Sequence, residues 1–270
     1  MKTIKINSLE GDIITDTLGI RVTNVNPNLP LNEEAINDLK TAINKYHLIF
    51  LKSPEPIALE NQVTLTKQLG EPWVYDYIPG QYKDYPEVFK VTNQKGNGFA
   101  NAGQAWHSDG SIYNRSMYLS VFSIGEIPKD GASTYFSSLH NALERLPKNL
   151  AEKLNNTEAL FGKMYKPHAV IWEHPITSKK VLHINEGFSD GFRDKVTGKL
   201  FSQKENEELY KFFNKHLWEE NTYYEHKWNF GDLVIADNYA LAHYAKPTHS
   251  NTLRVLHRTA TKGIKRQKPS

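Results

Sequence analysis

Three residues far apart in this sequence carry groups that suit a mononuclear metal centre. His107 and Asp109 stand two positions apart, and His243 follows more than 130 residues later. Two histidines and one carboxylate can bind Fe(II) on one face and leave the other coordination positions open. Of the eleven histidines, only His107 is followed two residues later by an acidic residue, and composition alone predicts about one such pair. The pair alone is therefore weak support, and the hypothesis depends on His243.

The elements around these residues can bring them together. If the segment around His107 is extended, His107 and Asp109 point the same way, because side chains alternate along a strand. Residues 233–236 are an apolar, strand-like run, and the polar turn after them leads His243 onto what looks like a core element. The third ligand has to come from such a distant segment, because one strand cannot supply a whole face of ligands.

Two arginines near the end of the chain predict an anionic ligand. Arg254 begins a strand-like run, residues 254–260, and alternation puts Arg258 on the same face. Two guanidinium groups on one face of an apolar strand are costly unless they meet anions. Arginine suits a carboxylate because its planar fork pairs with both oxygens and stays charged.

The wider pattern predicts a β-rich fold decorated by helices. Helices are expected over residues 32–46, 58–69, 138–154 and 203–216. Short runs rich in Val, Ile, Tyr, Phe and Trp, bounded by turn residues, predict strands over residues 48–51, 88–92, 118–123, 133–136, 169–172, 181–184, 223–228, 233–236 and 254–260. Strands without regular β-then-α alternation favour an α+β protein with a sandwich or jelly roll. No linker is visible, so one domain over residues 1–270 is expected.

Composition excludes several classes of function. The 270 residues are 39% hydrophobic and 23% charged, and the formal charge is 33 − 30 = +3. A spread of charge this even is not typical of a nucleic-acid binder. The absence of cysteine excludes disulfides, thiolate catalysis and iron–sulfur clusters. There is no apolar leader and no run of about 18 apolar residues. We therefore expect a cytoplasmic protein that binds neither nucleic acid nor a membrane; a homo-oligomer is left open.

These residues resemble a known site. His107-Ser108-Asp109 with His243 and Arg254 resembles the iron and keto-acid site of the taurine dioxygenase (TauD/TfdA) family of Fe(II)/2-oxoglutarate-dependent dioxygenases. Other segments are similar to that family in the same order, and the resemblance covers about residues 31–261: Gly131-Ala132-Ser133-Thr134, His174-Pro175, residues 182–188, Gly231-Asp232, Asp237-Asn238 and Arg258.

The resemblance implies a double-stranded β-helix (jelly-roll) core and an oxidoreductase. His107, Asp109 and His243 would be the catalytic metal ligands, and Thr134 with Arg254 would bind the far carboxylate of 2-oxoglutarate. Arg258 matches an arginine that contacts the substrate anion or the keto acid, and which arginine takes which anion is left open. The implied cofactors are Fe(II), 2-oxoglutarate and O₂. 2-Oxoglutarate would become succinate and CO₂ while a substrate C–H bond is hydroxylated or desaturated; with Asp109 present, halogenation is not expected.

The substrate is expected to be a small molecule, anionic or derived from an amino acid. Trp73, Tyr75 and Tyr77 lie in a region that helps to close over substrate in the family, and ordinary half-buried loop aromatics are the alternative. The aromatics slightly favour natural-product tailoring, including isonitrile biosynthesis. The alternative is catabolic oxidation of taurine, another sulfonate or an aryloxyalkanoate. A cupin-like jelly-roll module that holds metal without turnover, or a zinc hydrolase, would use the same ligands.

Overall fold

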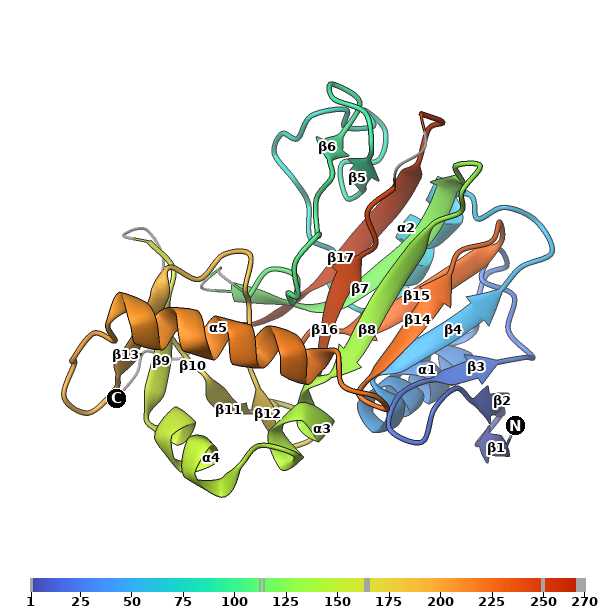
Figure 1. The fold of residues 1–270 in the computed structure, drawn as a ribbon. Coiled ribbons are helices and arrows are strands. Elements are labelled where there is room, and N and C mark those ends of the chain that lie inside the picture. The colour runs from blue at the N-terminus through green and yellow to red at the C-terminus, as the bar shows by residue number, and fades with distance from the viewer. Residues whose placement is uncertain (1, 112, 114, 163–165, 249–250, 266–270) are drawn as a thin grey trace.

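The structure is a computed structural model and describes residues 2–111, 113, 115–162, 166–248 and 251–265. Two β-sheets face each other at its centre (Figure 1). The larger sheet has the strand order β1-β2-β3-β4-β15-β7-β17-β5-β6. Its strands in chain order are β1 (Thr3–Ile6), β2 (Leu9–Ile13), β3 (Ile20–Val22), β4 (Leu48–Lys52), β5 (Phe89–Thr92), β6 (Phe99–Ala100), β7 (Arg115–Glu126), β15 (Asp232–Asp237) and β17 (Val255–Lys265).

The facing sheet is smaller, with the order β14-β8-β16. Its strands are β8 (Ser133–Ser138), β14 (Tyr223–Lys227) and β16 (Leu241–Ala245). The excursion between β8 and β14 forms two minor sheets, β10-β9-β13 and β11-β12. Their strands are β9 (Thr157–Leu160), β10 (His168–Ala169), β11 (Ile171–Glu173), β12 (Lys180–Leu182) and β13 (Gly191–Asp194).

Helices cover the sheets from outside. They are α1 (Glu33–Tyr46), α2 (Leu59–Leu69), α3 (Leu139–Glu144), α4 (Lys148–Asn155) and α5 (Gln203–Leu217). The Asn32 side chain caps α1 by accepting a hydrogen bond from the backbone N–H of Ala35, as its position predicts. The single helix expected over residues 138–154 is wrong. The chain forms α3 and α4 instead, because Pro147 has no backbone N–H and sits at the start of α4.

Strict alternation of side chains gives the large sheet two apolar faces. In β15, Leu233 and Ile235 pack in the outer core with residues of α1 and α2, whereas Val234 and Ala236 belong to the inner core between the two sheets. The inner core also contains Phe136 from the small sheet. The α+β class with a jelly-roll core that the sequence predicts is thus confirmed, and the mouth of this sandwich is where the candidate ligands meet.

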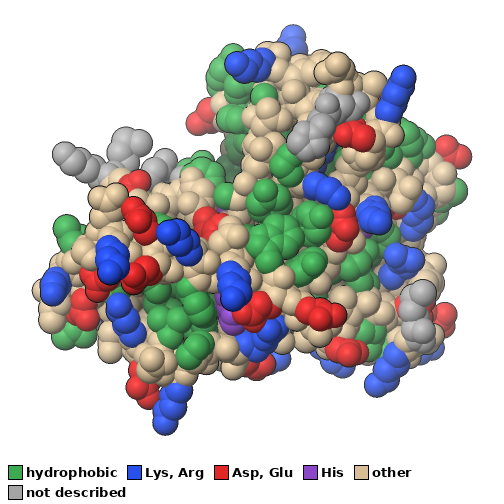
Figure 2. Space-filling view, viewed as in Figure 1, with side chains coloured by type: hydrophobic (Ala, Val, Ile, Leu, Met, Phe, Trp, Pro, Cys, Tyr) green, Lys and Arg blue, Asp and Glu red, His purple; other side chains and the backbone are tan. Residues whose placement is uncertain are grey.

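The N-terminal region adds three strands that the sequence analysis did not predict. The runs that become β1, β2 and β3 are only three to five residues long and are partly exposed, so they carry little hydrophobic pattern. Figure 2 shows Lys and Arg side chains interspersed with Asp and Glu over the face viewed. Among the described residues, none of the helices combines the length and the apolar character needed to cross a membrane.

Candidate metal centre

A backbone bridge places the two candidate histidine ligands side by side. The N–H of His107 donates to the carbonyl of His243 at 3.1 Å, and the N–H of His243 donates back to the carbonyl of His107 at 2.8 Å. Directly opposed residues of this kind carry their side chains on the same face. The two imidazole centroids are 4.2 Å apart. The separation of 136 residues in sequence is thus closed by one pair of hydrogen bonds between β16 and the segment before β7.

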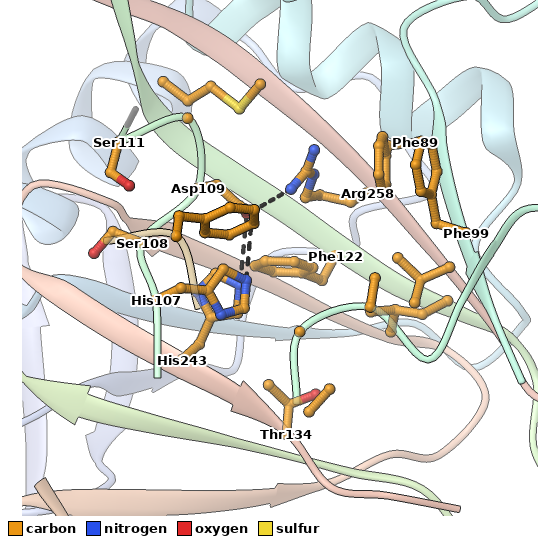
Figure 3. A pocket seen from close by; sticks show the side chains of 18 of the residues that line it. Phe89, Phe99, His107, Ser108, Asp109, Ser111, Phe122, Thr134, His243 and Arg258 are labelled. Atoms are coloured by element: carbon orange, nitrogen blue, oxygen red, sulfur yellow. Dashed lines mark hydrogen bonds and ion pairs between the residues drawn. The ribbon is translucent and has the colours of Figure 1, made fainter. Parts of the chain in front are cut away.

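Asp109 completes the set of ligands from the same segment as His107. Its carboxylate oxygens lie 3.9 Å from Nε2 of His107 and 3.6 Å from Nε2 of His243. The three candidate ligand atoms all lie within 4.8 Å of one another, so small side-chain shifts would let them share one metal ion, whose ligand atoms at about 2.1 Å are at most about 4.2 Å apart. Figure 3 shows both imidazoles pointing toward the carboxylate.

The hydrogen bonds around His107 prepare it for a metal. Its Nδ1 lies 2.8 Å from the carbonyl of Ala105, an acceptor only, so Nδ1 carries the proton and Nε2 keeps its lone pair. Burial, and after it the nearby His107, lowers the pKa of His243 to about 3, so this imidazole is neutral at pH 7. Neutral imidazoles and an ionised carboxylate are the donors that Fe(II) takes in a facial site.

Arg258 neutralises the candidate carboxylate ligand. One guanidinium nitrogen, Nη1, donates to Oδ1 of Asp109, and Nη2 donates to the hydroxyl of Tyr75 at 2.6 Å. Burial by itself would raise the pKa of Asp109, but Arg258 and the two histidines outweigh it and hold that pKa at about 2. The same ion pair keeps Arg258 charged although it is buried. The Nε of Arg258 has no acceptor among the residues that the structure describes.

The three candidate ligands open into a cavity of about 430 Å³ with a mainly apolar wall. Phe89 and Phe99 stack at 4.4 Å on one side, and the guanidinium of Arg258 lies over the Phe89 ring at 4.3 Å. Figure 3 shows Phe122 beside the histidines and Thr134 at the opposite end from Arg258. The remaining described wall is made of Tyr75, Val91, Ala102, Gly103, Ser108, Gly110, Ser111, Tyr113, Met117, Phe188, Ala245 and Leu256.

Thr134 and Arg254 are placed differently. Thr134 lines the cavity, and its hydroxyl oxygen accepts a hydrogen bond from Nε1 of Trp228 at 2.9 Å. The proton of Thr134 is therefore still free to be donated. Arg254 precedes β17 and is not among the wall residues, but it is 4% exposed, and its Nε and Nη2 have no partner within the described part of the chain. Burial lowers its pKa to about 10.

The alternation predicted for the arginine strand survives in β17. The register shift between Val255 and Leu256 skips Gly125 on β7, so the extra residue lies on β7 and not on β17. Leu256 and Arg258 accordingly both line the cavity. His257 points to the other side, where its Nε2 lies 2.9 Å from the hydroxyl of Tyr82.

The aromatic residues proposed for substrate separate into three positions. Tyr75 lines the cavity and binds Arg258. Trp73 is not part of the cavity wall. Its ring stacks on the ring of Tyr113, a wall residue, with the two ring centroids 5.3 Å apart. Tyr77 is 83% exposed and is also absent from the wall, so the structure does not bring it to the cavity. The segment from residue 71 to 88 forms no strand, so no alternation of side chains along a strand could predict from sequence where these three aromatic side chains point.

Several residues of the site were missed by the sequence analysis. Phe89 and Phe99 meet only because β5 and β6 pair in parallel, which no local pattern reveals. Ser120 donates to Oδ2 of Asp109 at 2.6 Å, and Asn238 donates to Ser120 at 2.9 Å. The signal for Ser120 was a polar residue in alternation with Phe122 and Ile124, which face the inner core, because such a residue needs a buried partner.

Comparison with known proteins gives a consistent family. The model of the family described as "Taurine catabolism dioxygenase TauD, TfdA family" matches residues 13–260. An alkylsulfatase from Acinetobacter baylyi is 23% identical in sequence, and the match covers 93% of this chain and 84% of that protein. An alpha-ketoglutarate-dependent sulfate ester dioxygenase from Pseudomonas putida is 20% identical, over 95% and 91%. A structure described as a putative alpha-ketoglutarate-dependent taurine dioxygenase from Burkholderia xenovorans superposes with a TM-score of 0.81 at 21% identity, covering 95% of this chain and 90% of that one.

Proposed function

Because this chain belongs to the TauD/TfdA dioxygenase family, we propose that it is a single-domain Fe(II)- and 2-oxoglutarate-dependent dioxygenase whose iron is held by His107, Asp109 and His243. When bound, the iron and the keto acid supply the oxidising chemistry: O₂ is activated, 2-oxoglutarate becomes succinate and CO₂, and a substrate C–H bond is oxidised. The protein's own residues bind and orient the two organic molecules. The observation that carries this proposal is the bridge that brings the two histidines onto one face beside Asp109.

Arg254 and Thr134 would bind the far carboxylate of 2-oxoglutarate. Arg254 is a buried cation without a carboxylate partner among the described residues, which is unfavourable until an anion arrives. Thr134 lines the cavity and has a hydroxyl proton to donate, since Trp228 already fills one of its lone pairs. A cation and a neutral donor together suit a carboxylate.

Arg258 and Tyr75 would bind an anionic group of the substrate. The guanidinium of Arg258 lines the cavity and retains an unused Nε, and Tyr75 accepts from Arg258 and so keeps its own proton to donate. Because Asp109 already balances one unit of charge, Arg258 would hold the substrate by hydrogen bonds more than by net charge. Arg254, whose charge no described carboxylate balances, would then bind the keto acid.

The body of the substrate would be apolar and would carry no ammonium group. The wall is dominated by phenylalanine, valine, leucine and methionine side chains, with Phe188 half-exposed at the edge. Asp109 is the one carboxylate among the described wall residues, and it is committed to the metal and to Arg258. A free amino acid would thus leave its ammonium group unpaired, at a cost of several kcal/mol. An amino-acid-derived substrate would need a masked amine.

This cavity would suit an apolar anion better than a zwitterion such as a free amino acid or taurine. Two relatives are named for sulfate esters, an alkylsulfatase and a sulfate ester dioxygenase, and a third is named for 2,4-dichlorophenoxyacetate. Those names describe those proteins. An anionic head with a hydrocarbon or aromatic body is also what Arg258 and the stacked phenylalanines of this chain would accept.

The test is release of succinate from 2-oxoglutarate with Fe(II) and air, in the presence of a substrate panel. The panel contains alkyl sulfates, alkyl carboxylates and aryloxyacetates, matched with taurine and free amino acids. We expect succinate release to rise with one of the apolar anions, to need O₂, and to fall to background in Asp109→Ala. No succinate with any compound would favour a binding module, and turnover without O₂ and keto acid would favour a hydrolase. Stimulation by zwitterions alone would overturn the substrate assignment.

A further inference from the structure

A second cluster of histidine and aspartate lies behind the candidate metal centre. Oδ2 of Asp237, at the end of β15, is 3.1 Å from Nδ1 of His47 and 2.8 Å from Nε2 of His174. All three residues are buried, and their ligand atoms lie close enough together to hold a metal ion. The reaction proposed above uses none of them.

The hydrogen bonds of this cluster account for it without a metal. Nδ1 of His174 accepts from the backbone N–H groups of Ile176 and Thr177, both at 3.2 Å, so the proton of His174 sits on Nε2 and is donated to Asp237. The other oxygen of Asp237 accepts from the N–H of Tyr239 at 2.9 Å. The N–H of Asp237 in turn donates to the carbonyl of His47 at 2.9 Å. These four hydrogen bonds hold Asp237 in place.

The residue after Asp237 contacts the backbone of Asp109 and the serine that holds its carboxylate. Oδ1 of Asn238 accepts from the N–H of Asp109 at 3.2 Å, and its Nδ2 donates to Oγ of Ser120 at 2.9 Å. Because Asn238 occupies a lone pair of Ser120, the hydroxyl proton of Ser120 is directed to Oδ2 of Asp109, 2.6 Å away. These contacts close a ring from the backbone of Asp109 to its own carboxylate, and both Ser120 and Asn238 are buried.

We propose that Ser120 and Asn238 are positioning residues for the metal-binding carboxylate, and that His47, Asp237 and His174 form a metal-free anchor for Asn238. The proposal rests on the iron site proposed above. Arg258 draws one oxygen of Asp109 toward the substrate side of the cavity, and Ser120 holds the other. The opposed contacts fix the rotation of the carboxylate before metal arrives, and such supporting contacts typically change metal affinity by about 10- to 100-fold.

Titration of the metal-free protein with Co(II), followed by visible absorption, tests this without turnover. We expect one Co(II) per chain in the unaltered protein. Ser120→Ala should weaken Co(II) binding by about 10-fold or more, Asn238→Asp should weaken it as well because it removes the donor to Ser120, and Ser120→Thr should restore it. The matched control is Ser123→Ala: Ser123 lies on the same strand, is equally buried, and donates at 2.6 Å to Gln62 on the helix side.

Each outcome bears on a separate claim. Equal Co(II) affinities in Ser120→Ala and Ser123→Ala would overturn the positioning role, even if the iron site is right. A second Co(II) per chain that disappears in His174→Gln would overturn the metal-free anchor. A protein whose Co(II) binding survives His107→Ala unchanged would defeat the proposed iron site, and the inference with it.

Discussion

Replacing Arg254 by methionine should make the metal-free protein more stable and at the same time impair binding of 2-oxoglutarate. Arg254 is 4% exposed, and burial lowers its pKa from the ordinary 12.5 to about 10. A pKa that is lowered in the folded state means that the charged form is destabilised by folding. Each tenfold change in the acid dissociation constant corresponds to about 1.36 kcal/mol, so the buried charge costs the folded protein about 3 kcal/mol at pH 7. Arg254→Met removes this cost and keeps most of the side-chain stem.

The effect on the co-substrate has the opposite sign. The unpartnered Nε and Nη2 of Arg254 are the donors that a carboxylate would fill. Losing one partner of a buried, hydrogen-bonded charge pair costs about 2 to 5 kcal/mol, which is about 30- to 5,000-fold in the dissociation constant of 2-oxoglutarate. A residue with only a structural role would not give a gain in stability together with such a loss of affinity.

The assay is urea unfolding of the metal-free protein, followed by circular dichroism, with anaerobic titration of the Fe(II) protein with 2-oxoglutarate. Arg258→Met is the contrasting variant. It should lower the free energy of unfolding, because it leaves the buried carboxylate of Asp109 without its cation. If Arg254→Met is instead less stable than the unaltered protein and binds 2-oxoglutarate with the same affinity, Arg254 already has a partner in the folded chain and the reasoning fails.

Three further outcomes are expected. Trp228→Phe removes one donor to Thr134 and should weaken 2-oxoglutarate binding by about 2- to 10-fold, the value of one hydrogen bond, without changing Co(II) affinity; an unchanged dissociation constant would contradict the role of Trp228. Tyr75→Phe should raise the KM for an anionic substrate more than the KM for 2-oxoglutarate, and the reverse ranking would move this end of the cavity to the keto acid. Burial, with a smaller effect of Lys90, lowers the pKa of His257 to about 4. As the pH falls from about 6.5 to 4, the unfolded chain binds a proton at this histidine before the folded chain does, so the free energy of unfolding should fall by about 3 kcal/mol at most. The free energy of unfolding of His257→Gln should depend less on pH over that range, and an equal dependence in both proteins would refute this.

The sequence carried enough information to nominate three candidate ligands that lie together in the structure, but not their surroundings. The alternation of β17 and the spacing of His107 and Asp109 are local properties, and they predict which side chains share a face. The sequence analysis expected His243 to approach His107 but did not predict the bridge between them, because pairing of distant segments has no local signal. The ion pair between Arg258 and Asp109 could not be foreseen for the same reason, since it joins a strand to a loop 149 residues away.

Loops account for the remaining differences. Tyr77 and Trp73 lie in a segment without strand or helix, where the family resemblance suggests proximity to the cavity but no period gives a direction. The division of the helix at Pro147, by contrast, had a local cause in the sequence, because proline cannot continue a helix with a backbone hydrogen bond.

The most direct measurement is anomalous diffraction at the iron absorption edge from crystals grown without oxygen in the presence of Fe(II) and 2-oxoglutarate. The account predicts one iron peak per chain, within bonding distance of Nε2 of His107, Nε2 of His243 and a carboxylate oxygen of Asp109. An iron peak between His47, His174 and Asp237 instead, or no peak at the first site, would contradict it.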